Sequence, residues 1–494
     1  MPAFQVLSNT VAWLPWGASA FARAREERKP VLLFIATTWC QTCREMARTT
    51  YLDPSVATFI NNRFVPVRVD ADLRPDVSER YSLGGWPTTA FLTPGGDVLG
   101  GGTFVPVHRM LPVLAQVAEA FAARTGELVE ELPPLSAPCT PAAPVSLAIL
   151  SDAVFSAYDG ENGGFGREPK FPLVAPIRLA LELAGADEHS PYRAIAEASL
   201  DAMGWGGLYD EVDGGFFRYA ARRNWQSPHS EKMLDGNAAL LRLYLDAGAG
   251  FGLARFTERA ADVLRYVQTW LADPVDGGWW GSQEADDRYY GVITHDARRA
   301  VTAPQVGRVL FADANAAMVS AALHAAGVFD DDGLRDFALK SFERVLLASY
   351  KPGAGVAHSF DGRPGVRGLL ADQFAMAGAS LDAFALTGNV VYEMMAEELA
   401  HYAIRLMWDD VGGGFFDRAS DEPEPAFGLM RRRLKPFAAN CDLTGTLRRL
   451  ADTSGDPAFT TLADRTLAAM APLAAGHGSE AAHYLLAVRA AGVR

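Results

Sequence analysis

Pairs of glycines followed by aromatic residues recur through the last 350 or so residues of the chain, and they limit its possible folds more than any other feature. Adjacent glycines supply the positive φ angles of a tight turn, and the aromatic residue gives the turn a small core. The copies are Asn162-Gly-Gly-Phe165, Asp213-Gly-Gly-Phe-Phe217, Asp276-Gly-Gly-Trp-Trp280, a weaker one at Gly355–Asp361, and Val411-Gly-Gly-Gly-Phe-Phe416. Most are about 50 to 65 residues apart, which indicates a degenerate repeat.

The segments between these copies predict helices. Strand signals nearly vanish there, and alanine- and leucine-rich amphipathic stretches take over. Examples are Val145–Tyr158, Pro176–Ala184, Phe256–Ala272 and Leu334–Leu347. Dividing the region by the repeat length gives roughly six helix pairs. Six pairs that close on themselves would form an all-α (α/α)6 toroid, with the Gly-Gly loops on one rim.

The part before a proline-rich stretch at residues 132–144 has a different pattern, in which short apolar runs alternate with helical segments. The predicted strands are Val31–Ala36, Phe64–Asp70, Thr88–Leu92 and Asp97–Thr103. The predicted helices are Ala18–Arg28, Arg44–Thr50, Pro54–Asn62 and Pro106–Arg124. This order, closed by a hairpin and a last helix, predicts an α/β sandwich.

Two cysteines, Cys40 and Cys43, carry the strongest chemical signal. Cys40 follows a predicted strand and opens a helical segment, where free N–H groups and the helix dipole stabilise a thiolate. Cys43, one turn further on, can attack a mixed disulfide formed on Cys40. Trp39 precedes the pair, and Pro87 lies just before a strand, where thioredoxin-like folds place a cis-proline beside the cysteines. We therefore predict a thioredoxin-type site with Cys40 as nucleophile and Cys43 as resolving thiol.

Half of a zinc site has the same cysteine spacing, but the sequence offers no second Cys-x-x-Cys and no local histidine pair. We therefore expect no metal and no cofactor, and a disulfide-bearing protein or small thiol as partner. The predicted domains are a thioredoxin-like domain at 1–131, a linker at 132–144 and the toroid at 145–494.

Further motifs resemble the thioredoxin-domain family named after spermatogenesis-associated protein 20. They are Trp13-Leu-Pro-Trp16, Arg74-Pro-Asp76, Gly84-Gly-Trp-Pro87, Phe91-Leu-Thr-Pro94, Gly101-Gly-Thr-Phe104, Glu168-Pro-Lys-Phe-Pro172, Gly215-Phe-Phe-Arg-Tyr219 and Pro228-His-Ser-Glu-Lys-Met-Leu234. The helical part of that family is similar to six-hairpin glycosidases and N-acylglucosamine 2-epimerases, so the resemblance implies an architecture more than a reaction. The chain departs from it at Gln41 and Arg44, where the family usually carries histidines. Phe34 replaces the buried acid of thioredoxins, so proton transfer must be arranged differently.

Four helical segments begin with similar polar sets, at Asp235, Asp313, Asp372 and Asn440. Such residues often only cap helices. Alternatively, inner helices of a toroid start at one rim, and these side chains surround a cavity mouth. The candidate ligand-binding residues are Glu168, Lys170, Asp210, His229, Glu231, Lys232, Asp235, Asn237, Asp313 and Asp372.

With aromatic residues from the Gly-Gly loops (Phe216, Phe217, Trp225, Trp279 and Trp280), such a mouth would suit a sugar-like ligand. Carboxylate pairs could also hydrolyse glycosides if their separation is right. Epimerisation needs two opposed bases, and only His229 lies in a mouth motif. His295 and His358 are interpreted as incidental.

Three functions therefore stay open: a thiol-disulfide oxidoreductase, a redox sensor or scaffold that binds a polar ligand, and a sugar hydrolase or epimerase. A net charge of -14 argues against nucleic acid as a partner. The first residues carry no basic leader, and no segment approaches the roughly 20 apolar residues that span a bilayer. We expect a cytoplasmic protein without membrane contact, in which Cys139 and Cys441 are inert.

Overall fold

The computed structural model describes residues 11–123, 146–421 and 426–492. The chain divides into two compact units, one made of Met1–Leu135 with Ser420–Arg433 and the other of Ser136–Ala419 with Leu434–Arg494. The proline-rich stretch 132–144 and Cys139 lie outside the described residues. No helix within the described ranges is long and apolar enough to cross a membrane.

The first unit contains a five-stranded sheet in the order β1-β3-β2-β4-β5. β2 is parallel to β3, whereas β4 is antiparallel to both β2 and β5. The strands are β1 (Leu14–Pro15), β2 (Val31–Ala36), β3 (Val65–Asp70), β4 (Thr88–Leu92) and β5 (Val98–Gly102). All six residues of β2 are buried, as its continuous apolar sequence predicts for a central strand.

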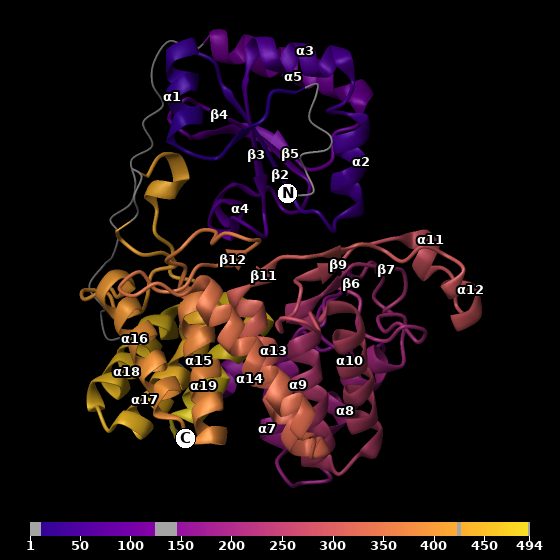
Figure 1. Ribbon diagram of the computed structural model, residues 1–494, viewed down its shortest axis with the longest axis vertical. Coiled ribbons are helices and arrows are strands. Elements are labelled where there is room, and N and C mark those ends of the chain that lie inside the picture. The colour runs from indigo at the N-terminus through magenta and orange to yellow at the C-terminus, as the bar shows by residue number, and fades with distance from the viewer. Residues whose placement is uncertain (1–10, 124–145, 422–425, 493–494) are drawn as a thin grey trace. The chain divides into compact units, whose positions relative to one another are not determined.

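Five helices accompany the sheet, and α3 packs against α5 beside it (Figure 1). They are α1 (Ala18–Glu27), α2 (Gln41–Thr49), α3 (Pro54–Arg63), α4 (Pro75–Tyr81) and α5 (Val107–Ala122). The predicted α/β thioredoxin-like fold is confirmed. The sequence analysis did not predict β1 or α4, which are too short to show a clear period.

A distant segment of the chain completes the core of the first unit. Its 3-10 helix η3 (Gly428–Arg431) packs against α4, and Phe427 lies 4.1 Å from Phe21 between ring centres. The Tyr81 hydroxyl donates to the Gly96 carbonyl and accepts the Leu429 N–H, both at 2.8 Å. Met430 is 4% exposed. Residues from the far end of the sequence thus bury apolar surface of the thioredoxin-like unit.

The second unit is an (α/α)6 toroid, as predicted. Six inner helices contact one another in a closed ring, in the order α7, α9, α13, α15, α17, α19 and back to α7. The inner helices are α7 (Val174–Ala184), α9 (Leu234–Phe251), α13 (Ala312–Phe329), α15 (Leu370–Thr387), α17 (Phe437–Ser454) and α19 (Ala481–Ala490). The outer helices are α6 (Leu147–Phe155), α8 (Pro191–Gly204), α10 (Ala254–Tyr266), α14 (Asp332–Ser349), α16 (Val390–Met407) and α18 (Pro457–Ala474).

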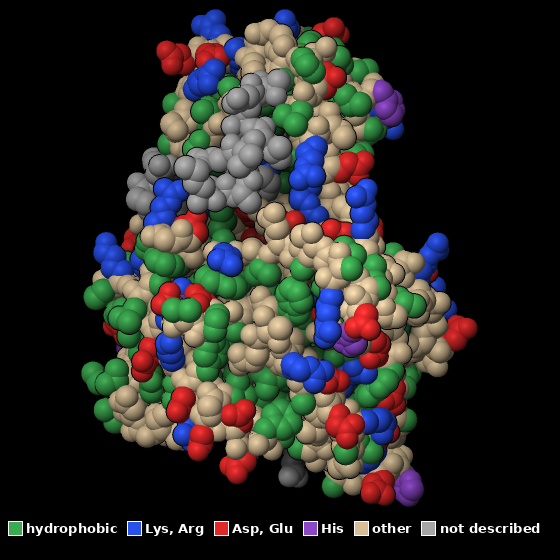
Figure 2. Space-filling view, turned by 45° about the vertical axis from the view of Figure 1, so that its right-hand side comes forward, with side chains coloured by type: hydrophobic (Ala, Val, Ile, Leu, Met, Phe, Trp, Pro, Cys, Tyr) green, Lys and Arg blue, Asp and Glu red, His purple; other side chains and the backbone are tan. Residues whose placement is uncertain are grey.

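Short strands and two small helices connect the toroid helices. They are β6 (Tyr219–Ala220), β7 (Pro228–His229), β8 (Lys232–Met233), β9 (Ser282–Gln283), α11 (Asp287–Tyr290), α12 (His295–Arg299), β10 (Val306–Gly307), β11 (Leu310–Phe311) and β12 (Ser359–Phe360). On the face shown in Figure 2, acidic and basic side chains are interspersed, with no continuous basic area among the described residues.

We expect Gly428→Ala to release the segment that contains η3. Gly428 has φ +51°, and an added Cβ would collide with the Gly96 carbonyl and the Tyr81 hydroxyl. Trypsin should then cleave faster at Arg431, Arg432 and Arg433. The control is Gly102→Ala in the same unit, where a Cβ meets nothing within 4 Å. Equal cleavage of the two variants would contradict the packing described here.

Candidate functional site

Cys40 is the N-cap of α2, and its sulfur accepts the backbone N–H of Cys43 at 3.2 Å. Cys40 keeps 7% of its surface exposed and Cys43 only 1%, and both thiols are free. Because the cap position adds an N–H donor and the helix dipole to Cys40, its thiolate is favoured. Burial raises the pKa of Cys43 above its ordinary value, and its contact with Cys40 raises it further.

The segment that contains Cys40 and the segment that contains Pro87, which the sequence predicts to lie together, are adjacent. Trp39 packs edge-on against Trp86, with ring centres 5.8 Å apart, and the Trp86–Pro87 peptide bond is cis. The Trp39 indole also donates to Asp72 at 2.6 Å, which fixes the residue before Cys40. Pro87 is buried. The surroundings of Cys40 are therefore held by packing and by a hydrogen bond to a carboxylate.

A half-buried cation, Arg68, interacts electrostatically with Cys43. Arg68 on β3 is the register partner of Phe34 on β2, and its guanidinium lies 5.4 Å from the Phe34 ring centre. Burial lowers the pKa of Arg68 to about 10, while Asp70, Tyr51 and Cys43 act electrostatically to raise it. Burial raises the pKa of Asp70 to about 6, although the backbone N–H groups of Asp72 and Leu73 oppose this. Arg68 thus places a positive charge near Cys43, where thioredoxins use an acid on the strand that here carries Phe34.

In the toroid, several predicted ligand-binding residues hold the Gly-Gly loops together. An aspartate begins each loop and pairs with a cation: Asp159 with Lys170 at 2.8 Å, and Asp210 with Lys232 at 2.7 Å. Both lysine side chains are fully buried. The Lys232 ammonium also donates to the Gly214 carbonyl at 2.6 Å. Burial lowers the pKa of Lys232 to about 8, against the attraction of Asp210.

The same arrangement recurs in other repeats. Lys435 bonds Asp409 at 2.5 Å and the Gly413 carbonyl at 2.6 Å. Arg344 bonds Asp273 at 2.8 Å and also contacts the Gly277 carbonyl. Because these pairs occur in corresponding places, the structure favours a structural role for Lys170, Asp210 and Lys232. The sequence signal that could have shown this is the aspartate four to five residues before each glycine pair.

The amides at the starts of the inner helices also face the loops. Asn237 accepts the Phe216 N–H at 2.7 Å and donates to the carbonyls of Phe216 at 3.1 Å and Met233 at 2.8 Å. Three other side chains make the corresponding bonds: Asn315 to Trp279, Gln373 to Val356, and Asn440 to Phe415. Asn237 is 1% exposed and both of its N–H donors are used, so it anchors a loop.

The remaining candidates on the loops lie apart from these anchors. His229 is exposed and stacks on Tyr219 with ring centres 4.2 Å apart. Glu231 is 3% exposed and lies 3.4 Å from Arg218. Glu168 is exposed and accepts the Arg223 N–H at 3.0 Å. The aromatic residues expected to line a cavity are instead largely in the core, since Phe216, Trp225 and Trp279 are at most 1% exposed.

Two other candidates, Asp313 and Asp372, do converge, together with a histidine that sequence reasoning dismissed. The Nδ1 atom of His358 lies 2.9 Å from Asp372 and 4.0 Å from Asp313. Asp372 is fully buried, whereas the Asp313 side chain is 39% exposed. Nothing around His358 in the sequence signals this role, because the pairing of β11 with β12 brings it there.

Asp235 belongs to the same electrostatic neighbourhood. Burial raises its pKa, and the charge of Asp313 raises it further. Burial likewise raises the pKa of Asp313, which His358 lowers and Asp372 raises. Asp235 is nevertheless solvent-exposed. The three aspartates therefore form an acidic group at the N-terminal ends of α9, α13 and α15, in which water can reach Asp235 and Asp313 while Asp372 is buried.

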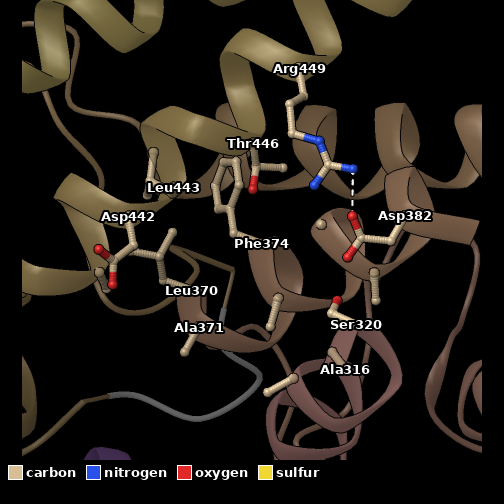
Figure 3. Close-up of a pocket in the computed structure, with 15 residues that line it drawn as sticks. Ala316, Ser320, Leu370, Ala371, Phe374, Asp382, Asp442, Leu443, Thr446 and Arg449 are labelled. Carbon is tan, nitrogen blue, oxygen red and sulfur yellow. Dashed lines mark hydrogen bonds and ion pairs between the residues drawn. The ribbon is translucent and has the colours of Figure 1, made fainter. Parts of the chain in front are cut away.

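A separate cavity of about 360 Å³ lies along the inner helices α13, α15 and α17. Figure 3 shows its lining, with Arg449 donating to Asp382 at 2.7 Å. Much of its wall is alanine, and none of the ten predicted ligand-binding residues lines it. Asp442, which belongs to the polar set at the start of α17, does line it.

We expect Asn237→Ala to destabilise the toroid by about 1–3 kcal/mol, because the Phe216 N–H would be left buried without a partner. Asp235→Asn, two residues earlier and exposed, should change stability by less than about 0.5 kcal/mol. Urea unfolding of both full-length variants measures this. A smaller effect of Asn237→Ala than of Asp235→Asn would exclude the anchoring role.

Comparison with known proteins agrees with this architecture. Residues 3–136 match the family described as "Protein of unknown function, DUF255", under the label Thioredox_DsbH. Spermatogenesis-associated protein 20 from Mus musculus is 30% identical over 309 residues, and that from Homo sapiens is 31% identical over 311. Each match covers 56% of this chain and 39% of the relative, so the chain spans about two fifths of the curated relatives it matches.

Solved structures match the helical part. A sugar epimerase from a ruminal bacterium is 12% identical with a TM-score of 0.51, covering 65% of this chain and 85% of that one. A GH76 alpha-mannanase from Bacteroides thetaiotaomicron is 10% identical with a TM-score of 0.50, covering 70% and 94%. At these identities the likeness shows the fold alone. The chain is thus similar over part of its length to the thioredoxin-domain proteins named after spermatogenesis-associated protein 20, and its fold combines a thioredoxin-like unit with an (α/α)6 toroid.

Proposed function

We propose that the thioredoxin-like unit catalyses thiol-disulfide exchange through Cys40 and Cys43. The observation that carries this proposal is the position of Cys40 as the N-cap of α2, with its sulfur accepting the Cys43 N–H at 3.2 Å. A sulfur in this position gains from the helix N-terminus when it is ionised. Cys43 lies directly behind it and is nearly inaccessible. The partner is a disulfide-bearing protein or a small disulfide.

The reaction is a two-electron transfer. The Cys40 thiolate attacks one sulfur of the substrate disulfide, whose S–S bond breaks as the Cys40 mixed disulfide forms, and the first substrate thiolate leaves. Cys43 then loses its proton and attacks the Cys40 sulfur, which releases the second substrate thiolate and forms the Cys40–Cys43 disulfide. The substrate is reduced and the protein oxidised. Water takes the Cys43 proton.

We expect Cys43→Ser to accumulate mixed disulfides with partner proteins, whereas Cys40→Ser should accumulate none. The reason is that only Cys40 is accessible to a substrate, and only Cys43 can release it. Non-reducing electrophoresis after acid quenching measures the trapped species, with the variant that lacks both cysteines as control. Trapping by Cys40→Ser alone would reverse the two roles, and no trapping by either variant would count against exchange chemistry.

A pH-dependent effect on stability should follow from Asp70. Its pKa is raised from 3.8 to about 6 in the folded protein, so the folded state favours the neutral carboxyl. Ionisation therefore destabilises the fold as pH rises from about 4 to above 6, by up to about 3 kcal/mol. Relative to the wild type, Asp70→Asn should gain stability above pH 6 and lose this advantage below pH 4. The urea midpoints of both proteins across this range test it, and a difference independent of pH would contradict it.

A second function is favoured by the acidic group at the starts of the inner helices. We propose that Asp235 and Asp313 bind hydroxyl groups of a sugar-like ligand. These two carboxylates can be reached by water, and they supply hydrogen-bond acceptors for such a ligand. The neighbours in the structure comparison that are named as an epimerase and a mannanase support a carbohydrate-like ligand without identifying it.

We expect a monosaccharide such as mannose to bind the full chain, and Asp313→Asn to weaken that binding by about tenfold or more, since a hydrogen bond to a charged group contributes about 1.5–3 kcal/mol. Calorimetric titration measures the affinity. Glu258→Gln on the outer helix α10 is the control, because Glu258 is exposed. No binding of any of several monosaccharides, or equal binding by Asp313→Asn, would count against this second function.

A further inference from the structure

The side chains of Asp313, His358 and Asp372 form a compact set of possible metal ligands. One ligand atom from each residue lies within 4.8 Å of the others. Ligand atoms around a tetrahedral zinc ion lie about 3.4 Å apart, as follows from metal-ligand distances near 2.1 Å. The observed distances of 2.9 and 4.0 Å from the His358 Nδ1 atom to the two carboxylates bracket this value.

The backbone around the set is fixed before any ligand arrives. The His358 carbonyl accepts the Ala312 N–H at 2.8 Å, and the His358 N–H donates to the Val366 carbonyl at 2.8 Å. These bonds place the imidazole beside the first turn of α13, which carries Asp313. Asp372 lies in the first turn of α15. Three elements far apart in sequence therefore present their side chains to one point, as a preformed binding site requires.

An independent observation concerns the second oxygen of Asp372. The Asp372 side chain is fully buried, and its Oδ2 atom has no hydrogen-bond partner among the described residues. A buried carboxylate oxygen without a donor is costly, and a bound cation would compensate for it. The other oxygen of Asp372, Oδ1, lies 2.9 Å from the His358 Nδ1 atom.

We propose that Asp313, His358 and Asp372 bind a divalent transition-metal ion of the zinc class. Two carboxylates and one imidazole match the preference of such ions for nitrogen and oxygen ligands. The protein offers three ligands, and the 39% exposure of the Asp313 side chain leaves one side open to water or to an oxygen of another ligand. Three protein ligands and an open position are typical of reactive rather than structural zinc sites. The proposal is independent of the thiol chemistry, but it shares Asp313 with the proposed sugar-binding group.

The experiment treats the full-length chain with a chelator to remove bound metal and then titrates it with Zn²⁺ alone. Calorimetry measures the binding. Because Cys40 and Cys43 could also bind zinc, all proteins carry Cys40→Ser and Cys43→Ser. We expect one ion per chain, and a loss of affinity of roughly 10- to 100-fold or more in His358→Gln and in Asp372→Asn. His295→Gln, which changes an exposed histidine elsewhere in the toroid, should bind Zn²⁺ as the parent does.

Two further measurements keep the test decisive. Asp313→Asn alters the most exposed ligand, so it remains informative if Asp372→Asn fails to fold. The visible spectrum of the Co²⁺ complex of the protein with Cys40→Ser and Cys43→Ser should lack a thiolate charge-transfer band. Absence of stoichiometric Zn²⁺ binding, binding that is lost only when the cysteines are removed, or unchanged affinity in the folded ligand variants would each overturn the proposal. Failure of monosaccharide binding would leave the zinc result intact, since no sugar is used.

Discussion

The toroid depends on one recurring hydrogen-bond arrangement, in which an amide at the start of an inner helix satisfies the backbone of a Gly-Gly loop. Asn440, for example, accepts the Phe415 N–H at 2.7 Å and donates to the Phe415 carbonyl at 2.9 Å. The loop is buried, so its backbone groups must find partners within the protein. Gly414, with φ +75°, lets the chain approach this amide closely. Each repeat thereby joins an outer helix to the next inner helix.

This arrangement also decides which polar residues remain available for chemistry. The amide at the fourth position of α9, α13, α15 and α17 faces the loop, so the aspartate that precedes it in α9, α13 and α15 faces elsewhere. Asp235 and Asp313 are accordingly reachable by water, whereas Asn237 and Asn315 are buried. In α15 the pattern shifts by one residue, because Gln373 takes the anchoring place and Asp372 meets His358. The need to bond the loop backbone thus explains why the amides are buried while Asp235 and Asp313 are left exposed to water.

Much of this architecture could be predicted from local patterns, because helix periods and glycine pairs act over a few residues. The predicted bounds of Val31–Ala36 and Thr88–Leu92 agree with β2 and β4. Long-range contacts could not be predicted: the packing of η3 on α4, the pairing of Phe34 with Arg68, and the place of His358 all depend on register or topology. The predicted roles of Lys170 and Lys232 required a choice between facing a cavity and facing a loop, and the aspartate before each glycine pair is the sequence feature that favours the loop.

The exchange of an acid for a cation near Cys43 has a chemical consequence. A buried carboxylate below a resolving cysteine accepts its proton, but its charge repels the thiolate that results. Here the strand residue is Phe34, and Arg68 contributes a positive charge that attracts a thiolate at Cys43. The Asp70 carboxyl, with a pKa of about 6, can take up a proton in this part of the structure. Because a cation stabilises the reduced, ionised form of the site, the proposed exchange would make this protein a weaker reductant of disulfides than a site with a carboxylate in that place.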